Sequence, residues 1–178
     1  MSDQSNKCVQ IVVNVDTDAK TRRPRRTKRP WLILNVGLRV GRLDVPTQEF
    51  ELVDIDGVGI LETDGPPGQW PGPRQTINLR HLTGNPKVVI NFSVLEPPEL
   101  HFPPDALKAI GLHHDDEGCP LRAVNAHKPQ FLRRGVSANG RQVSLQDIND
   151  DGKTYRFALF VYSGEKLVAL CDPRIINK

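Results

Sequence analysis

Cysteine is scarce in this chain, which has only Cys8, Cys119 and Cys171. An odd and widely spaced set does not make the disulfide framework of a small secreted domain, so we expect a reduced, cytoplasmic protein. Long apolar runs are also missing. The longest extends from Phe157 to Tyr162, far too short to span a membrane. The opening residues MSDQSNK have no apolar core, so we expect no secretory signal.

Recognisable catalytic motifs are missing as well. The chain has no GxSxG elbow, no phosphate-binding loop and no glycine pattern of a dinucleotide-binding strand and helix. Cys171 lies in a strongly apolar stretch, where a thiol is expected to pack rather than react. We therefore predict no catalytic residue and no cofactor, and we favour a protein that is not an enzyme.

Helical periodicity is rare, whereas proline (15 residues) and glycine (14 residues) are common. This balance favours short strands joined by turns. We predict an all-β fold over residues 1–178, a mainly antiparallel β-sandwich or barrel of about eight strands with one short helix. The helix is expected from Asp105 to Ile110, with Gly111 closing its end. Chain length suits a single domain.

The strongest element is a β-hairpin from Tyr155 to Cys171. Its first arm places Tyr155, Phe157, Leu159 and Val161 on one face, as the period of two in a strand requires. Residues 163–166 (SGEK) form the expected turn. Arms this apolar predict a hairpin inside a larger sheet.

Other stretches alternate less strongly. A second hairpin is predicted from Phe50 to Glu62, with Asp56-Gly57 as its turn. In the strand Trp31–Val40, Gly37 indicates a bulge or a close backbone approach. The remaining predicted strands are Cys8–Val15, Thr76–Leu79, Lys87–Leu95, Leu121–Ala126 and Gln142–Ile148, the last preceded by a turn at Asn139-Gly140.

The end of the chain resembles a known group. The last predicted strand, followed by Asp172-Pro173 and Ile175, is similar to the ending of several small bacterial β-sandwich proteins, among them the inclusion-body and AidA-like group. The resemblance implies a β-sandwich, covers the C-terminal part alone, and implies no function.

Positive charge is concentrated in one segment. Of the 24 basic residues, seven lie between Lys20 and Arg29 with no acid among them; the other 17 are set against 21 acidic residues. We call residues 20–29 the basic segment and expect it to form most of a loop at residues 20–30. Arginine pairs can contact phosphate or carboxylate in a bidentate manner. A solvated loop that binds nothing is the alternative interpretation.

A second loop, at residues 64–73, is rich in proline and glycine and contains Trp70. It either presents this tryptophan to a partner or covers the end of the sandwich with it. We predict a binding or assembly module that uses loops at one end. Its expected partner is an acidic protein surface or a polyanion, and a homo-oligomer is compatible with the pattern. The predicted binding residues are Arg22, Arg23, Arg25, Arg26, Lys28, Arg29, Trp31 and Trp70.

Two further functions are alternatives. A nucleic-acid-associated protein would hold the phosphate backbone through the basic segment. A metal-dependent enzyme would use the cluster from His113 to Cys119 (HHDDEGC), with His127 beyond it. This cluster has neither an HExxH nor a paired CxxC motif, and a polar loop after the helix is the favoured interpretation.

An acidic turn completes the set of candidates. Residues 147–152 (DINDDG) match the opening of a calcium-binding loop, but the twelfth position is Ala158 instead of glutamate. We therefore predict a turn that leads into the last hairpin and binds no metal.

Overall fold

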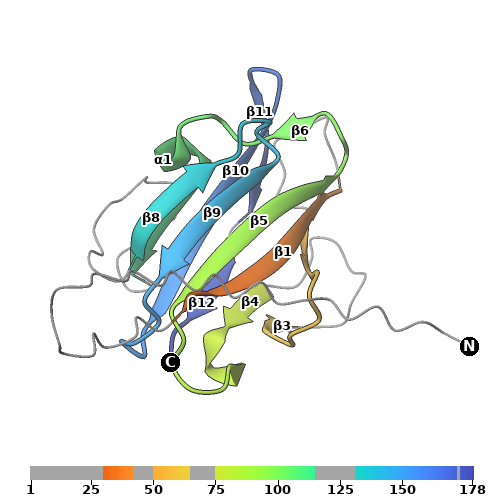
Figure 1. The fold of residues 1–178 in the computed structure, drawn as a ribbon. Helices are drawn as coiled ribbons and strands as arrows, with labels where there is room; N and C mark the ends of the chain where they lie inside the picture. Colours follow the sequence, from red (N-terminus) through yellow and green to blue (C-terminus); the bar gives the residue numbers. More distant parts are fainter. Residues whose placement is uncertain (1–29, 42–49, 65–74, 115–130, 172) are drawn as a thin grey trace, which may run out of the picture.

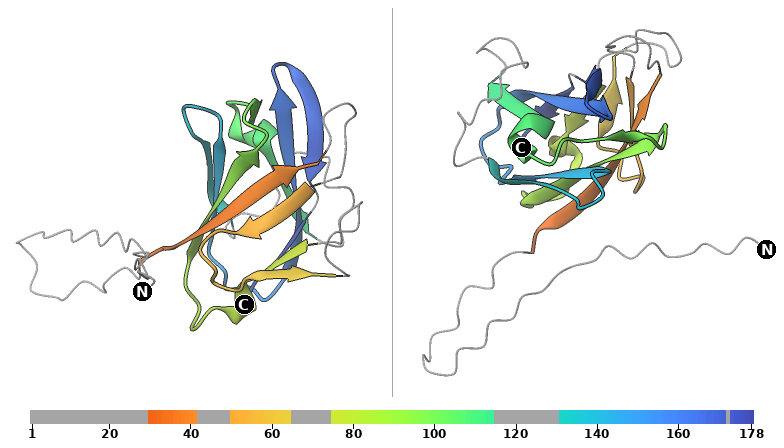
Figure 2. Two further views of the ribbon diagram at one scale, coloured as in Figure 1. Left: turned by 90° about the vertical axis from the view of Figure 1, so that its right-hand side faces the viewer. Right: turned by 90° about the horizontal axis from the view of Figure 1, so that it is seen from above.

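Two β-sheets make up the protein in this computed structural model, which describes residues 30–41, 50–64, 75–114, 131–171 and 173–178. A five-stranded sheet has the order β2-β1-β5-β9-β8, and a seven-stranded sheet contains the path β11-β10-β12-β4-β3. The sheets face one another as two layers (Figure 2). The predicted all-β, sandwich-like fold is confirmed.

Alternating apolar residues explain the five-stranded sheet. Along β5, every second side chain from Val88 to Val94 is buried, and β1 repeats this pattern from Leu34 to Val40. β1 and β5 are parallel neighbours, and the other strand pairs of this sheet are antiparallel (Figure 1). The strands are β1 Leu32–Val40, β2 Phe50–Asp54, β5 Val88–Glu96, β8 Phe131–Val136 and β9 Gln142–Asp147.

Strand β10 is the centre of the other sheet. It pairs antiparallel with β11, β12, β6 and β7. The predicted final hairpin is confirmed, with Gly164 in the left-handed region (φ 58°) at its turn. The strands are β3 Leu61–Thr63, β4 Gln75–Asn78, β6 Leu100–His101, β7 Ile110–His114, β10 Thr154–Ser163, β11 Lys166–Cys171 and β12 Arg174–Ile176, and a short 3-10 helix, η1 Leu79–His81, follows β4.

Aromatic contacts join the two sheets. The ring centroids of Phe92 on β5 and Phe157 on β10 lie 5.2 Å apart. Phe131 on β8 meets Tyr155 on β10 edge to face, with centroids 5.0 Å apart. Both phenylalanines of the first pair are fully buried, so the core is centred between β5 and β10.

The helix is shorter than predicted. α1 extends from Ala106 to Ala109, and Asp105 caps its start by accepting a hydrogen bond from the Leu107 N–H. Gly111 does not close it. The helix ends at Ile110, which is extended (φ −138°) and continues directly into β7. Because Ile110 and Gly111 pair with β10, sheet formation overrides the helix-ending signal.

The predicted hairpin from Phe50 to Glu62 is wrong. β2 pairs with β1, whereas β3 pairs with β4 in the opposite sheet. The connection turns through Gly57 (φ 64°) and Gly59 (φ 79°), and the Gly59 N–H donates to the Asp54 carboxylate at 2.7 Å. The next residue, Ile60, enters the core. Because Ile60 is buried between the sheets, the chain passes here from the five-stranded sheet to the seven-stranded sheet.

A side chain takes the place of a strand partner for β2. The Gln75 amide, on β4 of the opposite sheet, donates to the Leu52 carbonyl at 2.9 Å and accepts from the Leu52 N–H. This amide therefore satisfies both backbone groups of a buried residue at the edge of the five-stranded sheet.

Two other predicted strands, Cys8–Val15 and Leu121–Ala126, lie outside the described residues. The turn at Asn139-Gly140 forms as predicted, with Gly140 at φ 69°. The strand before it is β8, which the sequence pattern did not reveal. With β6, β7 and β12 also unpredicted, the described residues contain more strands than expected.

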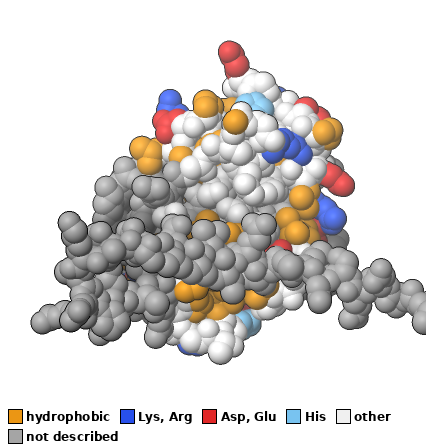
Figure 3. Space-filling view, viewed as in Figure 1, with side chains coloured by type: hydrophobic (Ala, Val, Ile, Leu, Met, Phe, Trp, Pro, Cys, Tyr) orange, Lys and Arg blue, Asp and Glu red, His pale blue; other side chains and the backbone are white. Residues whose placement is uncertain are grey.

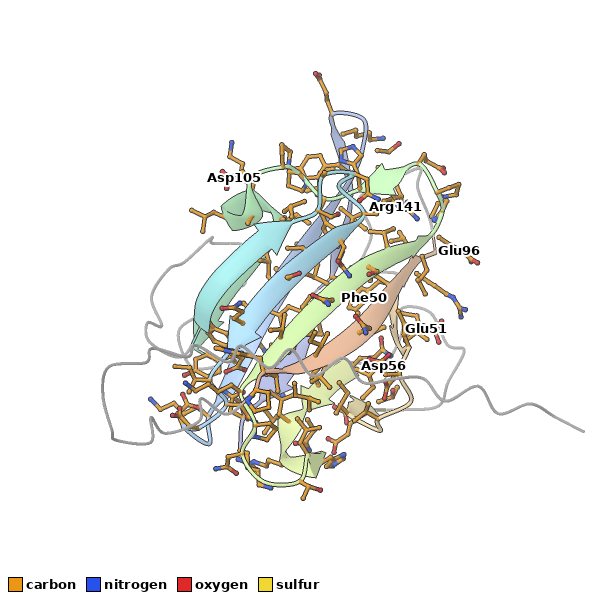
Figure 4. All side chains as sticks on the ribbon, viewed as in Figure 1. Phe50, Glu51, Asp56, Glu96, Asp105 and Arg141 are labelled. Atoms are coloured by element: carbon orange, nitrogen blue, oxygen red, sulfur yellow. The ribbon has the colours of Figure 1, made fainter. Side chains whose placement is uncertain are left out.

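Arg141 holds the loop that follows β5. Its guanidinium donates to the carbonyls of Val94, Pro98 and Leu100 at 2.7 Å each, and to those of Pro97 and Leu95 at 3.2 and 3.3 Å. Figure 4 shows this side chain beside β6 at the upper end of the sheets. One arginine thus bonds to five backbone acceptors, which lie at the end of β5, in the turn that follows it and at the start of β6.

Candidate functional site

Of the predicted binding residues, the structure describes Trp31. It lies directly before β1, is half-buried, and has the Lys87 ammonium 5.7 Å from its ring centroid. This is a cation–π contact. The other predicted binding residues lie outside the described residues, namely Arg22, Arg23, Arg25, Arg26, Lys28, Arg29 and Trp70.

Trp31 and Lys87 continue the outer face of the five-stranded sheet. The Leu32 N–H donates to the Lys87 carbonyl at 2.8 Å, which extends the ladder between β1 and β5 by one step. Ile33 and Asn35 follow Trp31 at spacings of two, whereas the alternate residues Leu34 and Val36 are buried. Alternation therefore places Trp31 on the same outer face as Ile33 and Asn35.

Three polar side chains cross this face in one row. Asn35 on β1 is in register with Asn91 on β5, which is in register with Ser144 on β9. The Asn91 amide donates to the Asn35 carbonyl oxygen at 3.2 Å, and the Ser144 hydroxyl donates to the Asn91 carbonyl oxygen at 2.7 Å. We call these three half-buried residues the polar row.

Asp56 sets the orientation of the polar row. Its carboxylate accepts from the Asn35 N–H at 2.9 Å and from the Asn35 side-chain amide at 3.0 Å. Figure 4 shows Asp56 below the ribbon of β1, after the end of β2. Because the Asn35 NH2 group faces this carboxylate, its oxygen faces Asn91. The donors and acceptors of the row therefore have one direction across the sheet.

Uncharged side chains flank the row on β5 and β9, and the Asp56 carboxylate lies at its β1 end. The Gln142 amide donates to the Ser93 hydroxyl at 3.2 Å in the adjacent register. The non-core positions next to the row hold uncharged residues: Ile33 and Gly37 on β1, Val89, Ser93 and Leu95 on β5, and Gln142 and Gln146 on β9. Farther along this sheet, Arg39 of β1 and Glu51 of β2 form an exposed ion pair. In Figure 3 the blue and red atoms of the described surface appear at the upper and right margins and at the lower edge.

At Gly37 a neighbouring strand comes close to the backbone, which is one of the two alternatives predicted for this glycine. A side chain there would meet Leu95 of β5, whose nearest carbon would lie 2.4 Å from the added Cβ. The register between β1 and β5 also shifts just after this point, between Leu38 and Arg39. Gly37 therefore leaves room for Leu95 to lie over the face beside the polar row.

The polar row was missed from sequence. Its three members are more than 50 residues apart in the chain, at separations of 56 and 53 residues. The available signal was that small polar residues, Asn35, Asn91 and Ser93, stand at non-core positions of Trp31–Val40 and Lys87–Leu95, which also hold the charged residues Arg39 and Lys87. That signal becomes a site only when the parallel pairing of β1 and β5 brings the residues into register.

The acidic turn at 147–152 is closed by the end of the chain. The Asn177 amide donates to Asp147 and Asp151 at 3.4 and 3.2 Å, and the Lys178 N–H donates to the Asn149 side-chain oxygen at 2.8 Å. Asn149 adopts the left-handed conformation (φ 55°). The amide of Asn177 thus lies between two carboxylates, where a cation would otherwise be expected in a calcium loop.

We predict that calcium does not stabilise the protein. The missing carboxylate at Ala158 leaves too few charged ligands to offset dehydration of the ion, and Asn177 already bridges the two aspartates. Thermal melts with a chelator and with millimolar calcium should coincide. A rise of several degrees with calcium, absent with magnesium, would contradict this prediction.

Asp151 is stabilised in its charged form. Burial by itself raises its pKa, but hydrogen bonds from the Tyr155 hydroxyl, the Lys153 N–H and Asn177, with the charge of Lys153, lower the pKa below its usual value. A lowered folded-state pKa contributes stability above the pKa of an unfolded aspartate. This contribution is lost as the pH falls through the folded-state value.

The predicted metal cluster is described only at its start. His113 and His114 belong to β7, whose backbone pairs with Arg156 and Tyr155, so the predicted polar loop is wrong at these two positions. Pairing with β10 keeps the backbone extended at these two positions. Residues 115–119 and His127 lie outside the described residues. Among the residues that the structure describes, no group of three or more His, Cys, Asp or Glu side chains is placed to hold a metal. Cys171 is buried, as expected for packing.

Comparisons with known proteins give no match to a protein-family model or to a curated protein. Within the described ranges, no helix has both the length and the apolar character needed to cross a membrane.

Proposed function

We propose that this protein is a non-enzymatic binding module that takes an anionic partner at the end of the sandwich where the basic segment joins β1. The observation that carries the proposal is the contact of Lys87 with Trp31. Trp31 stands two residues after Arg29, the last residue of the basic segment, and the contact adds the Lys87 ammonium from a distant part of the chain. Their charge and stacking surface add to those of the seven basic residues.

Two other cations lie at this end with their charges available. Arg80 donates to the carbonyls of Asn177 and Gly152 at 3.1 and 3.0 Å, and the Lys178 ammonium donates to the Leu82 carbonyl at 2.9 Å. These acceptors are neutral carbonyls, so the contacts hold the side chains without cancelling their charge.

The cytoplasmic location predicted from the few scattered cysteines forms part of the proposal. A partner that is an acidic protein surface or a nucleic acid is available there, and both have the charge that the basic segment requires. Binding through phosphates or sulfates releases counterions, so affinity should fall steeply as salt is added.

Replacing Arg22, Arg23, Arg25 and Arg26 by serine tests the proposal. We expect affinity for heparin at low salt to fall more than tenfold, because each lost phosphate- or sulfate-type contact removes a share of the salt-dependent term. Stability should change by no more than about 0.5 kcal/mol per site, as expected for a solvated segment. Binding titrations over a salt series and thermal melts measure the two effects.

The matched control replaces Lys108 and Lys166 by serine. Both are exposed, at α1 and at the start of β11, and this variant should bind heparin as the wild type does. Unfolding of the arginine variant, or equally weak heparin binding by wild type and arginine variant, would contradict the proposal.

A further inference from the structure

We infer that Gln75 shields the outer edge of β2 from strand addition, and that the strand it keeps away is β2 of a second copy of this chain. The inference concerns self-association and is independent of the proposed function. It rests on the two hydrogen bonds that join the Gln75 amide to the backbone of Leu52.

The backbone of β2 directs polar groups away from its own sheet. β2 is the end strand of the five-stranded sheet, beside β1 (Figure 2, left). In an antiparallel pair, alternate residues direct their N–H and C=O groups to opposite edges of the strand. Both groups of Leu52 meet Gln75 of the opposite sheet, so Leu52 directs them outward, and Phe50 and Asp54 do the same by alternation. Such an edge is a template for another strand.

The Gln75 amide occupies the place of a partner peptide group. A hydrogen-bonded pair in an antiparallel ladder exchanges two bonds, and a side-chain amide supplies the same donor and acceptor. The contact is at Leu52, the middle one of the three outward-directed residues. Gln75 and Leu52 are both buried, at 8% and 2% exposure, so the contact also excludes water. A strand can add to β2 here only after the Gln75 side chain leaves.

A second copy of β2 matches this edge. When two identical strands pair antiparallel about Leu52, each Leu52 N–H donates to the Leu52 carbonyl of the other copy across a two-fold axis. The same register sets Glu51 opposite Val53, and Phe50 opposite Asp54. No two acids then lie directly opposite each other, so the repulsion between like charges that destabilises a strand pair is avoided.

Gln75→Ala tests whether the edge is shielded. Its weight-average mass, measured by light scattering over a concentration series, should rise above that of wild type at the same concentration and approach twice that value. Gln146→Ala is the matched control. Gln146 is half-buried on β9 of the same sheet, and this variant should have the wild-type mass.

Gln75→Glu tests the hydrogen bonds with little change in shape. At pH 7 the carboxylate accepts from the Leu52 N–H but cannot donate to the Leu52 carbonyl. We expect added association and an unfolding equilibrium constant at least about tenfold above that of wild type. At about pH 4 the carboxyl is largely protonated and donates again. Because the folded state favours this protonated form, both differences from wild type should shrink as the pH falls. Gln146→Glu should show no such change.

Two results would overturn the inference. In the first, the Gln75 variants are destabilised but keep the wild-type mass, so that Gln75 bridges the two sheets without shielding an edge. In the second, Gln75→Glu differs from wild type equally at pH 7 and at pH 4, which would assign its effect to packing. Circular dichroism establishes that each comparison concerns folded protein, and Gln75→Glu supplies both readouts if Gln75→Ala does not fold.

Discussion

Phe157→Ala is expected to destabilise the protein by about 3–5 kcal/mol. Phe157 is fully buried on the strand that pairs with four others, and its ring packs 5.2 Å from that of Phe92 in the opposite sheet. The substitution removes apolar area and leaves a cavity where the two layers meet. Since a domain is stabilised by about 5–15 kcal/mol in total, little folded protein should remain on mild heating.

Phe160→Ala is the matched control for this prediction. Phe160 is on the same strand but half-buried, so its truncation should cost less than half as much. Urea unfolding of both variants gives the free energies of unfolding. Equal losses, or no loss at Phe157, would show that the core is not centred between β5 and β10.

Arg141→Met should cost about 3 kcal/mol or more. The guanidinium donates five hydrogen bonds to backbone carbonyls between Val94 and Leu100. A hydrogen bond to a charged group contributes about 1.5–3 kcal/mol, and a part-buried carbonyl left without a partner adds its own desolvation cost. Methionine keeps much of the apolar stem, so the loss reports the hydrogen bonds rather than packing.

Two further variants separate this effect from a general loss of charge. Arg141→Lys should recover part of the stability, because an ammonium has three donors but not the planar fork. Arg39→Met should cost less than about 1 kcal/mol, since Arg39 makes a 3.6 Å ion pair with Glu51 and both side chains are half exposed (50% and 52%). Similar losses for Arg39→Met and Arg141→Met would count against an anchoring role for Arg141.

The contrast between these two arginines shows a limit of reading sites from sequence. Arg141 follows a turn with no neighbouring charge, so nothing nearby in the chain indicates five acceptors. The polar row is similar, because its residues are ordinary until three strands align them. The basic segment is the reverse case. Its charge density is evident from sequence, and its consequence for binding needs a solution measurement.

Local sequence patterns by themselves determined the strands β1, β5 and β10–β11 and the turn at Asn139-Gly140, because strand period and turn chemistry act between residues a few positions apart. Apart from the β10–β11 hairpin, only the tertiary structure decided which strands pair. Burial of Ile60 sends β2 and β3 to different sheets, and the parallel register of β1 and β5 assembles the polar row. These outcomes depend on which apolar faces cover each other across the core, and that competition takes place between segments far apart in the chain.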